Sequence, residues 1–475
     1  MNDVLGHTED VSGWGVSPVP PSRRTLSGFD LAILWGDLGV GLLVLVTGGF
    51  LVPGLGFGAA MAAIVIGSVI GVALLALAGA AGASHGVATM VLFRPVLGIR
   101  GSWFPSALNA LQLIGWTAVE LWAMSFVADI VSREIFGFSA RWLWLGVVTV
   151  LCTGLALWGP VDVTRVWMKK FGAWVIGGIV IAVTVLAVTL DGIGDALRAP
   201  GDGSLAFGPA LDLVIAMPIS WLPLVADYTR FGRKARSAFF GTFWGYLVAN
   251  IWLYGLGAML VLGTGAAPSP AGIATAILAV VGGSIAGIMF LVALLVGETD
   301  EAFADIYSAS LSLKNVVPKV PLKYLIFGIS GISVVLAAWL TMERYEIFLF
   351  LIGSVFVPLF GILAADHFIN RRGRIDAAQL DVAGGSYWYT GGVRLAAIVP
   401  WVAGFLVYHW VLPTGPASWI DLVGNVAGEP LVVRLPWLSA SIAAFAVAFV
   451  TALRPVHRLS SATPGSQEVA REVDR

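Results

Sequence analysis

The chain has 475 residues and a net charge of −1; 58% of its residues are hydrophobic and 12% are charged, which gives a mean hydropathy of +0.90. Soluble domains contain roughly 45–50% apolar and about 25% charged residues, so this composition excludes a soluble globular domain. Residues 38–84 contain no charged side chain, and this run is about twice the ~20 apolar residues that cross a bilayer once. The composition therefore predicts an all-α, polytopic membrane protein.

Apolar runs separated by polar residues, glycine or proline predict twelve transmembrane helices. In chain order the runs are residues 29–50, 55–81, 105–131, 142–158, 173–190, 209–229, 238–262, 282–308, 324–342, 347–370, 395–412 and 437–453. A shorter apolar run, residues 273–281, predicts a helix that lies at the outer surface.

The distribution of basic residues predicts how these helices are oriented. An even number of spans places both termini on the same side of the membrane. If that side is the cytoplasm, only five of the 27 lysine and arginine residues lie on the outer side. These five are Arg133, Arg141, Arg198, Arg344 and Arg434. We therefore expect an integral protein of the cytoplasmic (inner) membrane, with cytoplasmic tails at residues 1–28 and 454–475.

Helix-breaking residues occur at matching places in two predicted helices. The first helix contains ILWGDLGVGLL, in which glycines surround Asp37, and the sixth contains AMPISWLPLVADYTRFGR, in which prolines bracket Ser220 and Trp221. Such breaks free backbone groups that can bind substrate or ions. Residues 29–190 and 209–370 each hold five helices and enter from opposite faces, so we interpret them as inverted repeats. The alternative is that glycine and proline are simply common in membrane helices.

A polar stripe lies on one face of the third predicted helix. Asn109, Gln112, Trp116 and Glu120 recur at spacings of three or four residues, which places them on one side of a helix. An indole flanked by amide and carboxyl groups suits a flat ring with hydrogen-bonding edges. The alternative is that the stripe joins buried helices to one another.

Residues 292–313, VALLVGETDEAFADIYSASLSL, place four acidic side chains in an apolar run. A carboxylate in hydrocarbon is costly unless it is paired, hydrated or protonated. Glu298, Glu301 and Asp305 share one helical face, whereas Asp300 points nearly the opposite way. Asp305 and Glu301 lie toward the inner end of the helix, so contact with cytoplasmic water is the alternative to a transport role for these two.

Glu298 lies deeper in the predicted bilayer and indicates a site for a coupling cation. Together with Asp37 in the first break and the hydroxyl of Thr299, it offers the oxygen ligands that hard cations such as sodium prefer. A proton is the competing ion, because a buried carboxyl group can bind one near neutral pH.

Two charged residues lie at the inner end of the sixth predicted helix. Asp227 and Arg230 are three residues apart, so they share a helical face. This placement favours a structural or gating pair near the cytoplasmic surface over a contact with substrate.

Several of these segments together resemble the nucleobase:cation symporter-1 family, which includes purine–cytosine permeases and hydroxymethylpyrimidine transporters. The segments are SWLPLVADYTRFGR, FRPVLGIRGSWFP, GWTAVE, EAFADIYSASLSL and GGSYWYTGGVRLAAIVPW. The resemblance runs from about residue 24 to residue 412. It implies a leucine-transporter-like fold of five plus five inverted helices, with the first and sixth helices broken, two extra helices in residues 395–453, and alternating access.

The resemblance also implies which residues contact substrate. The family's stacking aromatic on the third helix falls on Trp116, and a nearby amide position is occupied by Glu120. The stacking aromatic of the sixth helix falls on Trp221, beside Ser220 in the break. A polar contact from the eighth helix falls in the stretch from Glu301 to Asp305.

The family's sodium site lies between the first break and the eighth helix, which here means Asp37 to Val40 together with Glu298 and Thr299. This sequence differs from the family pattern because it has acidic residues at positions where the family has neutral ones. Glu120 replaces a glutamine-like amide, and GETDEAFAD stands where many relatives carry neutral threonine or asparagine ligands. The acids make a proton a serious competitor to sodium and favour a substrate edge rich in N–H donors. We expect no cofactor other than the coupling ion.

The sequence therefore predicts a secondary active transporter that imports a nucleobase or related heterocycle, such as cytosine, a purine or a hydroxymethylpyrimidine, by sodium or proton symport. An amino-acid or amine symporter on the same fold is the alternative, since acids suit a cationic amine. A channel would need a continuous polar stripe along several spans. The absence of an HExxH zinc motif argues against a zinc enzyme. The expected partners are the heterocycle, the cation and the lipid bilayer, with no nucleic acid.

Overall fold

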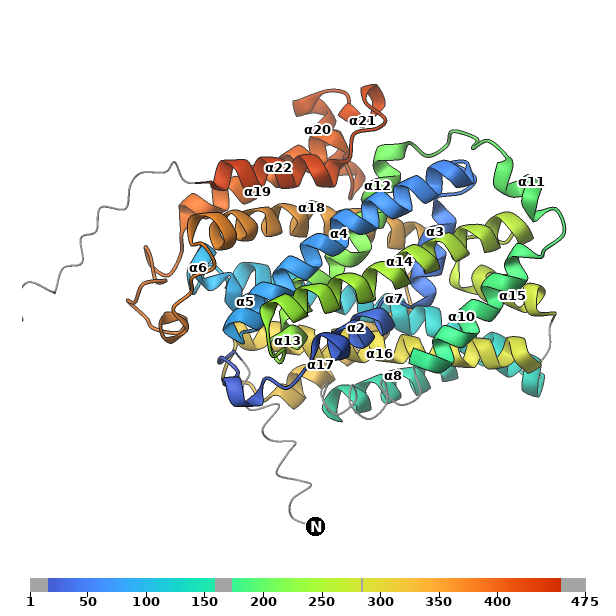
Figure 1. Ribbon diagram of the computed structural model, residues 1–475, viewed down its shortest axis with the longest axis horizontal. Helices are drawn as coiled ribbons and strands as arrows, with labels where there is room; N and C mark the ends of the chain where they lie inside the picture. The colour runs from blue at the N-terminus through green and yellow to red at the C-terminus, as the bar shows by residue number, and fades with distance from the viewer. Residues whose placement is uncertain (1–15, 159–172, 283–284, 454–475) are drawn as a thin grey trace, which may run out of the picture.

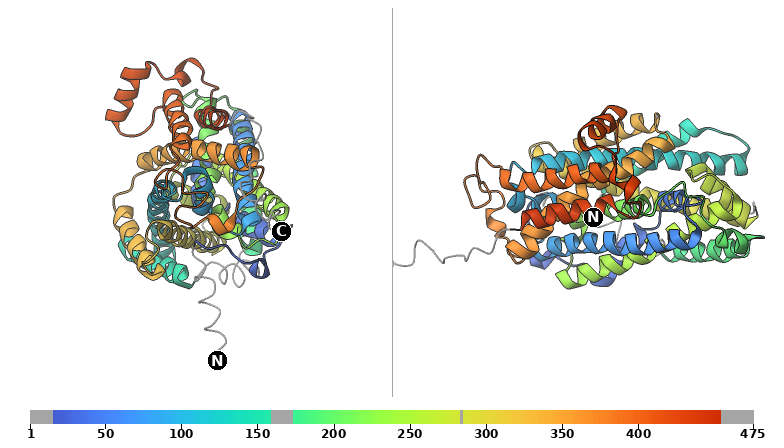
Figure 2. Two further views of the ribbon diagram at one scale, coloured as in Figure 1. Left: turned by 90° about the vertical axis from the view of Figure 1, so that its left-hand side faces the viewer. Right: turned by 90° about the horizontal axis from the view of Figure 1, so that it is seen from above.

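The computed structural model describes residues 16–158, 173–282 and 285–453, and its regular structure is helical (Figure 1). The long helices lie side by side along the long axis of the molecule (Figure 2). They are α2 (Gly28–Asp37), α3 (Leu42–Phe50), α4 (Phe57–His85), α7 (Trp103–Phe136), α8 (Arg141–Trp158), α10 (Ala173–Val188), α12 (Phe207–Trp221), α14 (Ala235–Thr264), α15 (Pro270–Val281), α16 (Ile285–Val316), α17 (Leu322–Ala337), α18 (Met342–Ala364), α19 (Leu395–Val411) and α22 (Ala440–Ala452). The shorter elements are η1 (Pro21–Arg23), α5 (Thr89–Leu92), α6 (Arg94–Leu97), α11 (Ile193–Arg198), η3 (Leu222–Leu224), α13 (Val225–Thr229), the π-helix η4 (Ala365–Asn370), η5 (Ala377–Gln379), α20 (Ala417–Ala427) and α21 (Leu431–Arg434).

Each predicted span coincides with one helix, except that the first falls on α2 and α3, the sixth on α12, η3 and α13, and the tenth on α18 and η4. Within the described residues, six helices are long and apolar enough to cross a bilayer, and the bent pair of α2 and α3 makes a seventh. The six are α4, α7, α8, α12 continued by α13, α14, and α18 continued by η4. The other predicted spans fall on α10, α16, α17, α19 and α22. These helices confirm an all-α membrane protein, while the count of twelve spans stays a prediction.

Several helices are longer than the apolar runs that predicted them. The third predicted helix, residues 105–131, is α7 and continues to Phe136, and the eighth, residues 282–308, is α16 and continues to Val316. The apolar run marks only the part of a helix that suits hydrocarbon, so the hydropathy pattern misses polar turns at its ends. Helix α7 ends where Gly137 adopts a left-handed conformation with φ of 73°, which glycine adopts without a steric cost.

Close backbone contacts hold the first helical pair against α14. A β-carbon on Gly245 of α14 would meet the backbone of Ala32 in α2, and one on Gly257 would meet the backbone of Leu45 in α3. Small residues let membrane helices approach this closely. The two glycines therefore fix α2 and α3 separately on one neighbour and set the position of the break between them.

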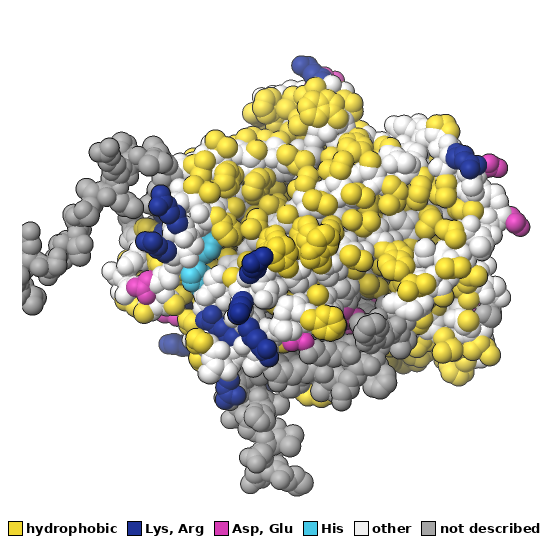
Figure 3. Space-filling view, in the orientation of Figure 1, with side chains coloured by type: hydrophobic (Ala, Val, Ile, Leu, Met, Phe, Trp, Pro, Cys, Tyr) yellow, Lys and Arg dark blue, Asp and Glu magenta, His cyan; other side chains and the backbone are white. Residues whose placement is uncertain are grey.

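The charged side chains gather at one end of the bundle. Figure 3 shows most of the visible lysine and arginine side chains at the end that carries α5, α6 and η1, with an apolar surface along the helices. Such clustering is typical of the cytoplasmic end of membrane helices. Residues 1–15 of the predicted N-terminal tail 1–28, the whole predicted C-terminal tail 454–475 and residues 159–172 lie outside the described residues.

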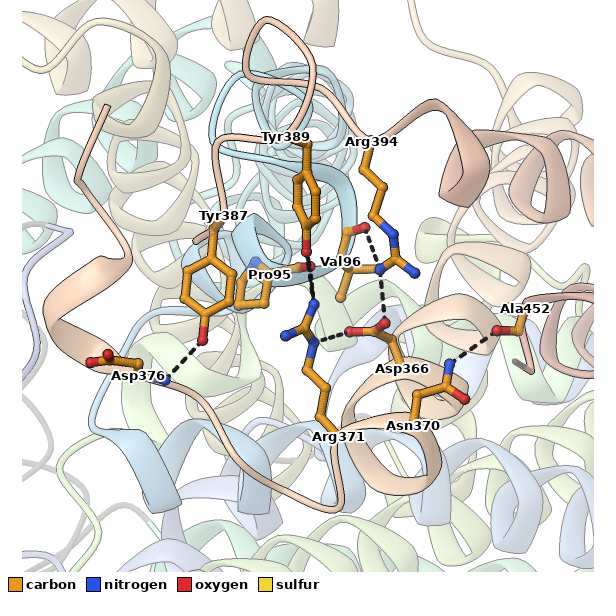
Figure 4. Close-up of polar contacts among 10 residues, drawn as sticks. All are labelled: Pro95, Val96, Asp366, Asn370, Arg371, Asp376, Tyr387, Tyr389, Arg394 and Ala452. Atoms are coloured by element: carbon orange, nitrogen blue, oxygen red, sulfur yellow. Dashed lines mark hydrogen bonds and ion pairs between the residues drawn. The ribbon is translucent and has the colours of Figure 1, made fainter. Parts of the chain in front are cut away.

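At that same end, the connection between α18 and α19 folds back onto the connection between α4 and α7 (Figure 4). Asp366 accepts hydrogen bonds from Arg371 at 2.5 Å and from Arg394 at 2.8 Å. Arg371 and Tyr389 both donate to the carbonyl of Pro95, at 2.8 and 2.6 Å. We call the charged group Asp366–Arg371–Arg394 the end clamp. It joins two of the motifs that define the family resemblance, GGSYWYTGGVR and FRPVLGIRG.

Arg94 extends this connection to α16. Its guanidinium donates to Asn315 at 2.6 Å and also pairs with Asp381. Burial lowers the pKa of Arg94 to about 10, so the side chain keeps its charge at neutral pH. Asn315 in turn donates to Ser102 at 3.0 Å. The motif residues far from the predicted site therefore connect the ends of several helices.

Candidate functional site

The first predicted break is present in the structure. Helix α2 ends at Asp37 and α3 begins at Leu42, and the two axes differ by 62°. The backbone hydrogen bonds of the residues between them are local, such as that from the N–H of Val40 to the carbonyl of Asp37 at 2.9 Å. The break therefore exposes the N-terminal end of α3 inside the bundle.

The second predicted break is also present and falls directly after Trp221. Helix α12 ends there, the chain makes a 3₁₀ turn through Pro223, and α13 begins at Val225. The carbonyl of Ser220 leaves the helical pattern and accepts a hydrogen bond from the side-chain amide of Gln112 at 2.7 Å. A buried carbonyl freed by a helix break needs such a partner.

A small pocket lies between the two breaks; its cavity volume of about 10 Å³ is room for about one water molecule. Four helices contribute its lining: α3, α7, α12 and α16. The lining residues are Leu43, Trp116, Glu120, Met217, Ser220, Trp221, Glu301 and Asp305. The structure thus brings together all six residues that the sequence suggested for substrate contact. Leu43 and Met217 were missed, because an apolar residue in an apolar helix carries no distinguishing signal.

The cavity is acidic and has unsatisfied polar atoms. Three of its eight lining residues carry carboxyl groups, and none of the eight is basic. One oxygen each of Glu120 and Glu301, and the indole nitrogen of Trp116, are buried without a hydrogen-bond partner. Both Glu301 and Asp305 are buried, at 6% and 3% exposure, so the alternative that they meet water at the inner surface is wrong. Unpaired buried polar atoms favour a ligand that supplies their partners.

The polar stripe of α7 divides into two parts. Trp116 and Glu120 line the cavity. Asn109 instead donates to Ser312 of α16 at 2.7 Å, and Gln112 donates to the freed carbonyl of α12. The contacts between helices that the alternative predicted are therefore present for Asn109 and Gln112, whereas a binding role for Trp116 and Glu120 stays a prediction.

Aromatic side chains from two further helices support the two cavity tryptophans. Trp116 packs against Tyr345 and Phe348 of α18, at ring-centroid distances of 5.9 and 5.4 Å. Trp221 meets Trp35 of α2 edge to face at 6.1 Å. These partners come from helices distant in sequence, so no spacing pattern could reveal them.

The residues predicted to bind the cation lie around the first break. The N–H of Leu42, at the start of α3, donates to a carboxyl oxygen of Glu298. Asp37 and Val40 line a second pocket with a volume of about 220 Å³, which α10 and α14 also line. The hydroxyl of Thr299 donates to the carbonyl of Val296 at 2.6 Å within α16.

Asp300 also reaches this region, although the helical pattern placed it away from the other acids. Its carboxyl group lies near enough to that of Asp37 for the two to interact. Two like charges this close repel each other unless a cation or a proton compensates one of them. Among the described residues, no group of three or more histidine, cysteine, aspartate and glutamate side chains has the geometry of a bound metal ion.

The predicted gating pair lies at the end of the sixth span and is buried. Asp227 accepts a hydrogen bond from the backbone N–H of Thr89 at 3.1 Å, and the hydroxyl of Thr89 accepts one from Ala226 at 2.9 Å. Arg230 is close enough to Asp227 for their charges to interact. These contacts join α13 to α5, and a gating role for the pair stays a prediction.

Known proteins resemble this chain over most of its length. A putative allantoin permease of Escherichia coli is 25% identical, covering 87% of this chain and 92% of that protein. The cytosine permease of E. coli is 27% identical, covering 83% and 94%, and a hydantoin permease of Microbacterium maritypicum is 25% identical, covering 82% and 83%.

Solved structures share the fold. The nucleobase-cation-symport-1 family transporter Mhp1, in a closed conformation with bromovinylhydantoin bound, superposes with a TM-score of 0.77 at 22% identity, covering 92% of this chain and 94% of that one. A Na⁺-coupled sialic acid symporter superposes with a TM-score of 0.60 at 13% identity, covering 94% and 96%. Residues 18–429 match the family described as permeases for cytosine/purines, uracil, thiamine and allantoin. The chain therefore belongs to this permease family, as the motifs in its sixth, third and eighth helices predicted.

Proposed function

We propose that this permease imports a flat nitrogen heterocycle, a nucleobase or a close relative, which binds at the pocket between the two helix breaks once that pocket widens to admit the ring. The observation that carries the proposal is the joint placement of Trp116, Trp221 and three carboxyl groups around one small space. Indole rings offer apolar faces to a planar ring. Carboxyl groups accept hydrogen bonds from its N–H edge.

The charge of the lining supports a substrate edge that is rich in donors. Glu120, Glu301 and Asp305 surround the cavity without a basic residue in the lining. A ring that carries an amino group beside a ring nitrogen, as in cytosine, adenine or an aminopyrimidine, presents such an edge. The acids also support the alternative of a cationic amine, which would pair with a carboxylate without needing the tryptophans.

For the coupling cation, we propose a site at the first break formed by Asp37, Val40, Glu298 and Thr299. The carboxyl of Glu298 at the start of α3 and the proximity of Asp37 to Asp300 support it. Sodium and a proton both suit an acidic site at a helix break. Driving uptake with one gradient at a time distinguishes them.

The proposal includes the finer architecture: twelve spans, two inverted five-helix repeats at residues 29–190 and 209–370, and both termini in the cytoplasm. The coincidence of every predicted run with a helix supports the count. The gathering of basic side chains at the end of the bundle that carries η1 supports the orientation.

The test is uptake of radiolabelled cytosine into proteoliposomes, with sodium and proton gradients imposed separately. Unlabelled adenine, hypoxanthine, uracil, hydroxymethylpyrimidine, allantoin and amino acids serve as competitors. We expect gradient-driven uptake that a ring compound blocks and that Trp221→Ala abolishes. Trp244→Ala is the matched control, because Trp244 is 56% exposed on the outer face of α14. Accumulation of an amine, without accumulation of any ring compound, would instead favour the amino-acid or amine symporter.

A further inference from the structure

Glu301 belongs to both parts of the site. Its carboxyl group lines the substrate cavity together with Trp116 and Glu120. The same carboxyl group lies against the backbone of Gly41 in the first break, where Glu298 also lies. One oxygen of Glu301 and one of Glu298 are buried without a hydrogen-bond partner. The two carboxyl groups therefore stand side by side at the boundary between the predicted cation site and the substrate cavity.

Glycine at position 41 makes this approach possible. A β-carbon there would lie 3.0 Å from a carboxyl oxygen of Glu298 and 3.2 Å from the carboxyl carbon of Glu301, with a Glu301 oxygen closer still. The next residue, Leu42, donates its N–H to Glu298, and the residue after that, Leu43, lines the substrate cavity. Three consecutive residues at the start of α3 thus connect the two sites.

Two negative charges that share one end of a helix repel each other, and the positive end of the helix dipole offsets only part of that repulsion. A small cation bound beside Glu298 would compensate the second charge. Among the described residues, the titratable groups that interact with Glu301 are acids or phenols, from its own helix and from α2, α7, α14 and α18. They are Glu298, Asp300, Asp305, Asp37, Glu120, Tyr246 and Tyr345.

We propose that Glu301 is the positioning residue through which the bound cation and the substrate change each other's affinity. The proposal rests on the proposed function above. When a monovalent cation neutralises the pair at Gly41, the carboxyl of Glu301 is free to accept hydrogen bonds from the substrate in the cavity. Because coupling between binding sites is reciprocal, bound substrate raises the affinity for the cation by the same factor.

The test compares Glu301→Gln with Asp305→Asn. Asp305 lines the same cavity but does not lie among the groups nearest Gly41. The dissociation constant of cytosine, or of the best competitor, is measured in purified protein against sodium at fixed pH and against pH at fixed sodium. In the wild type, we expect the active cation to lower this constant by about tenfold, within the usual range of coupling between sites.

In Glu301→Gln, we expect binding that no longer depends on the cation, within about twofold. In Asp305→Asn, we expect weaker binding that keeps the full cation dependence. Unchanged dependence in Glu301→Gln would overturn the proposal, and so would its loss in both variants or the absence of any cation dependence in the wild type. Counterflow exchange in proteoliposomes shows whether a variant still carries substrate.

If Glu301→Gln fails to fold, Glu301→Asp replaces it as the test variant. The shorter side chain retains the charge but withdraws it from Gly41, so we expect a cation dependence several-fold smaller than in the wild type. A dependence equal to that of the wild type would contradict the proposal. A wild-type protein that binds no heterocycle at all would instead overturn the proposed function.

Discussion

The side-chain amide of Gln112 donates a 2.7 Å hydrogen bond to the carbonyl of Ser220, so a residue of α7 satisfies the backbone group that the break after α12 sets free. This contact fixes the position of the break relative to Trp116, which lies one turn further along α7. The cavity between the two helices depends on that position.

We expect Gln112→Ala to destabilise the protein and to weaken uptake. Leaving a buried carbonyl without its hydrogen-bond partner lowers the free energy of unfolding by about 1–3 kcal/mol. Trp221, the next residue after Ser220, would also no longer be held in position. Thermal unfolding in detergent and cytosine uptake measure the two effects. Leu111→Ala is the control, since Leu111 is 64% exposed on the same helix and its loss should leave both unchanged. Equal behaviour of the two variants would contradict the structural role of Gln112.

Gly41→Ala tests the close approach at the first break. The added methyl group would overlap the carboxyl of Glu301, so either the carboxyl or the start of α3 must move. We expect a folded protein with at least tenfold slower uptake. Gly58→Ala is the matched control, because a β-carbon on Gly58 would meet no atom within 4 Å. Normal uptake by Gly41→Ala would show that the two carboxyl groups do not need this position.

Glu120→Gln tests which substrate edge the cavity selects. The substitution replaces one acceptor oxygen with a donor, so we expect cytosine and adenine to compete about tenfold less well, while uracil and hypoxanthine lose less or gain. A tenfold change corresponds to about 1.4 kcal/mol, the size of one hydrogen bond. Competition against a single labelled substrate gives the ratios. Glu346→Gln, at an exposed position of α18, should leave all of them unchanged, and a uniform loss for every ring would argue against edge selection.

Asp366→Asn tests the end clamp. It leaves Arg371 and Arg394 without the carboxylate that both contact, and removal of one partner from a buried ionic group costs on the order of 3 kcal/mol. We expect a clearly lower midpoint of thermal unfolding. Glu429→Gln is the comparison, because its pair with Arg434 is largely exposed and such pairs contribute less than about 1 kcal/mol. Similar midpoints for the two variants would show that the clamp adds no stability.

Much of the site was predictable because its chemistry follows helical spacing. Trp116 and Glu120 are four residues apart, and Glu301 and Asp305 are four apart, so each pair had to share a face. Their meeting in one cavity required the relative placement of α7 and α16, which the family resemblance supplied. Hydrophobic periodicity alone gives no such placement.

Other features had no local signal. Asp300 sits nearly opposite Glu298 on a helical wheel, yet its carboxyl group interacts with that of Asp37 at the end of α2. Tyr345 supports Trp116 from a helix more than 200 residues away in the chain. The short amphipathic helix α20 follows an apolar span and precedes another, so its residues carried too little hydrophobic signal to separate from a loop.

The donor that holds Glu298 is a main-chain N–H at the start of α3. Because every amino acid except proline carries that group, no ordinary substitution at position 42 can remove it. Relatives that change their coupling ion can therefore vary the acids around the break, but the positive end of the half-helix stays where the backbone places it. The electrostatic preference for a negative charge at this point is inherited with the fold itself.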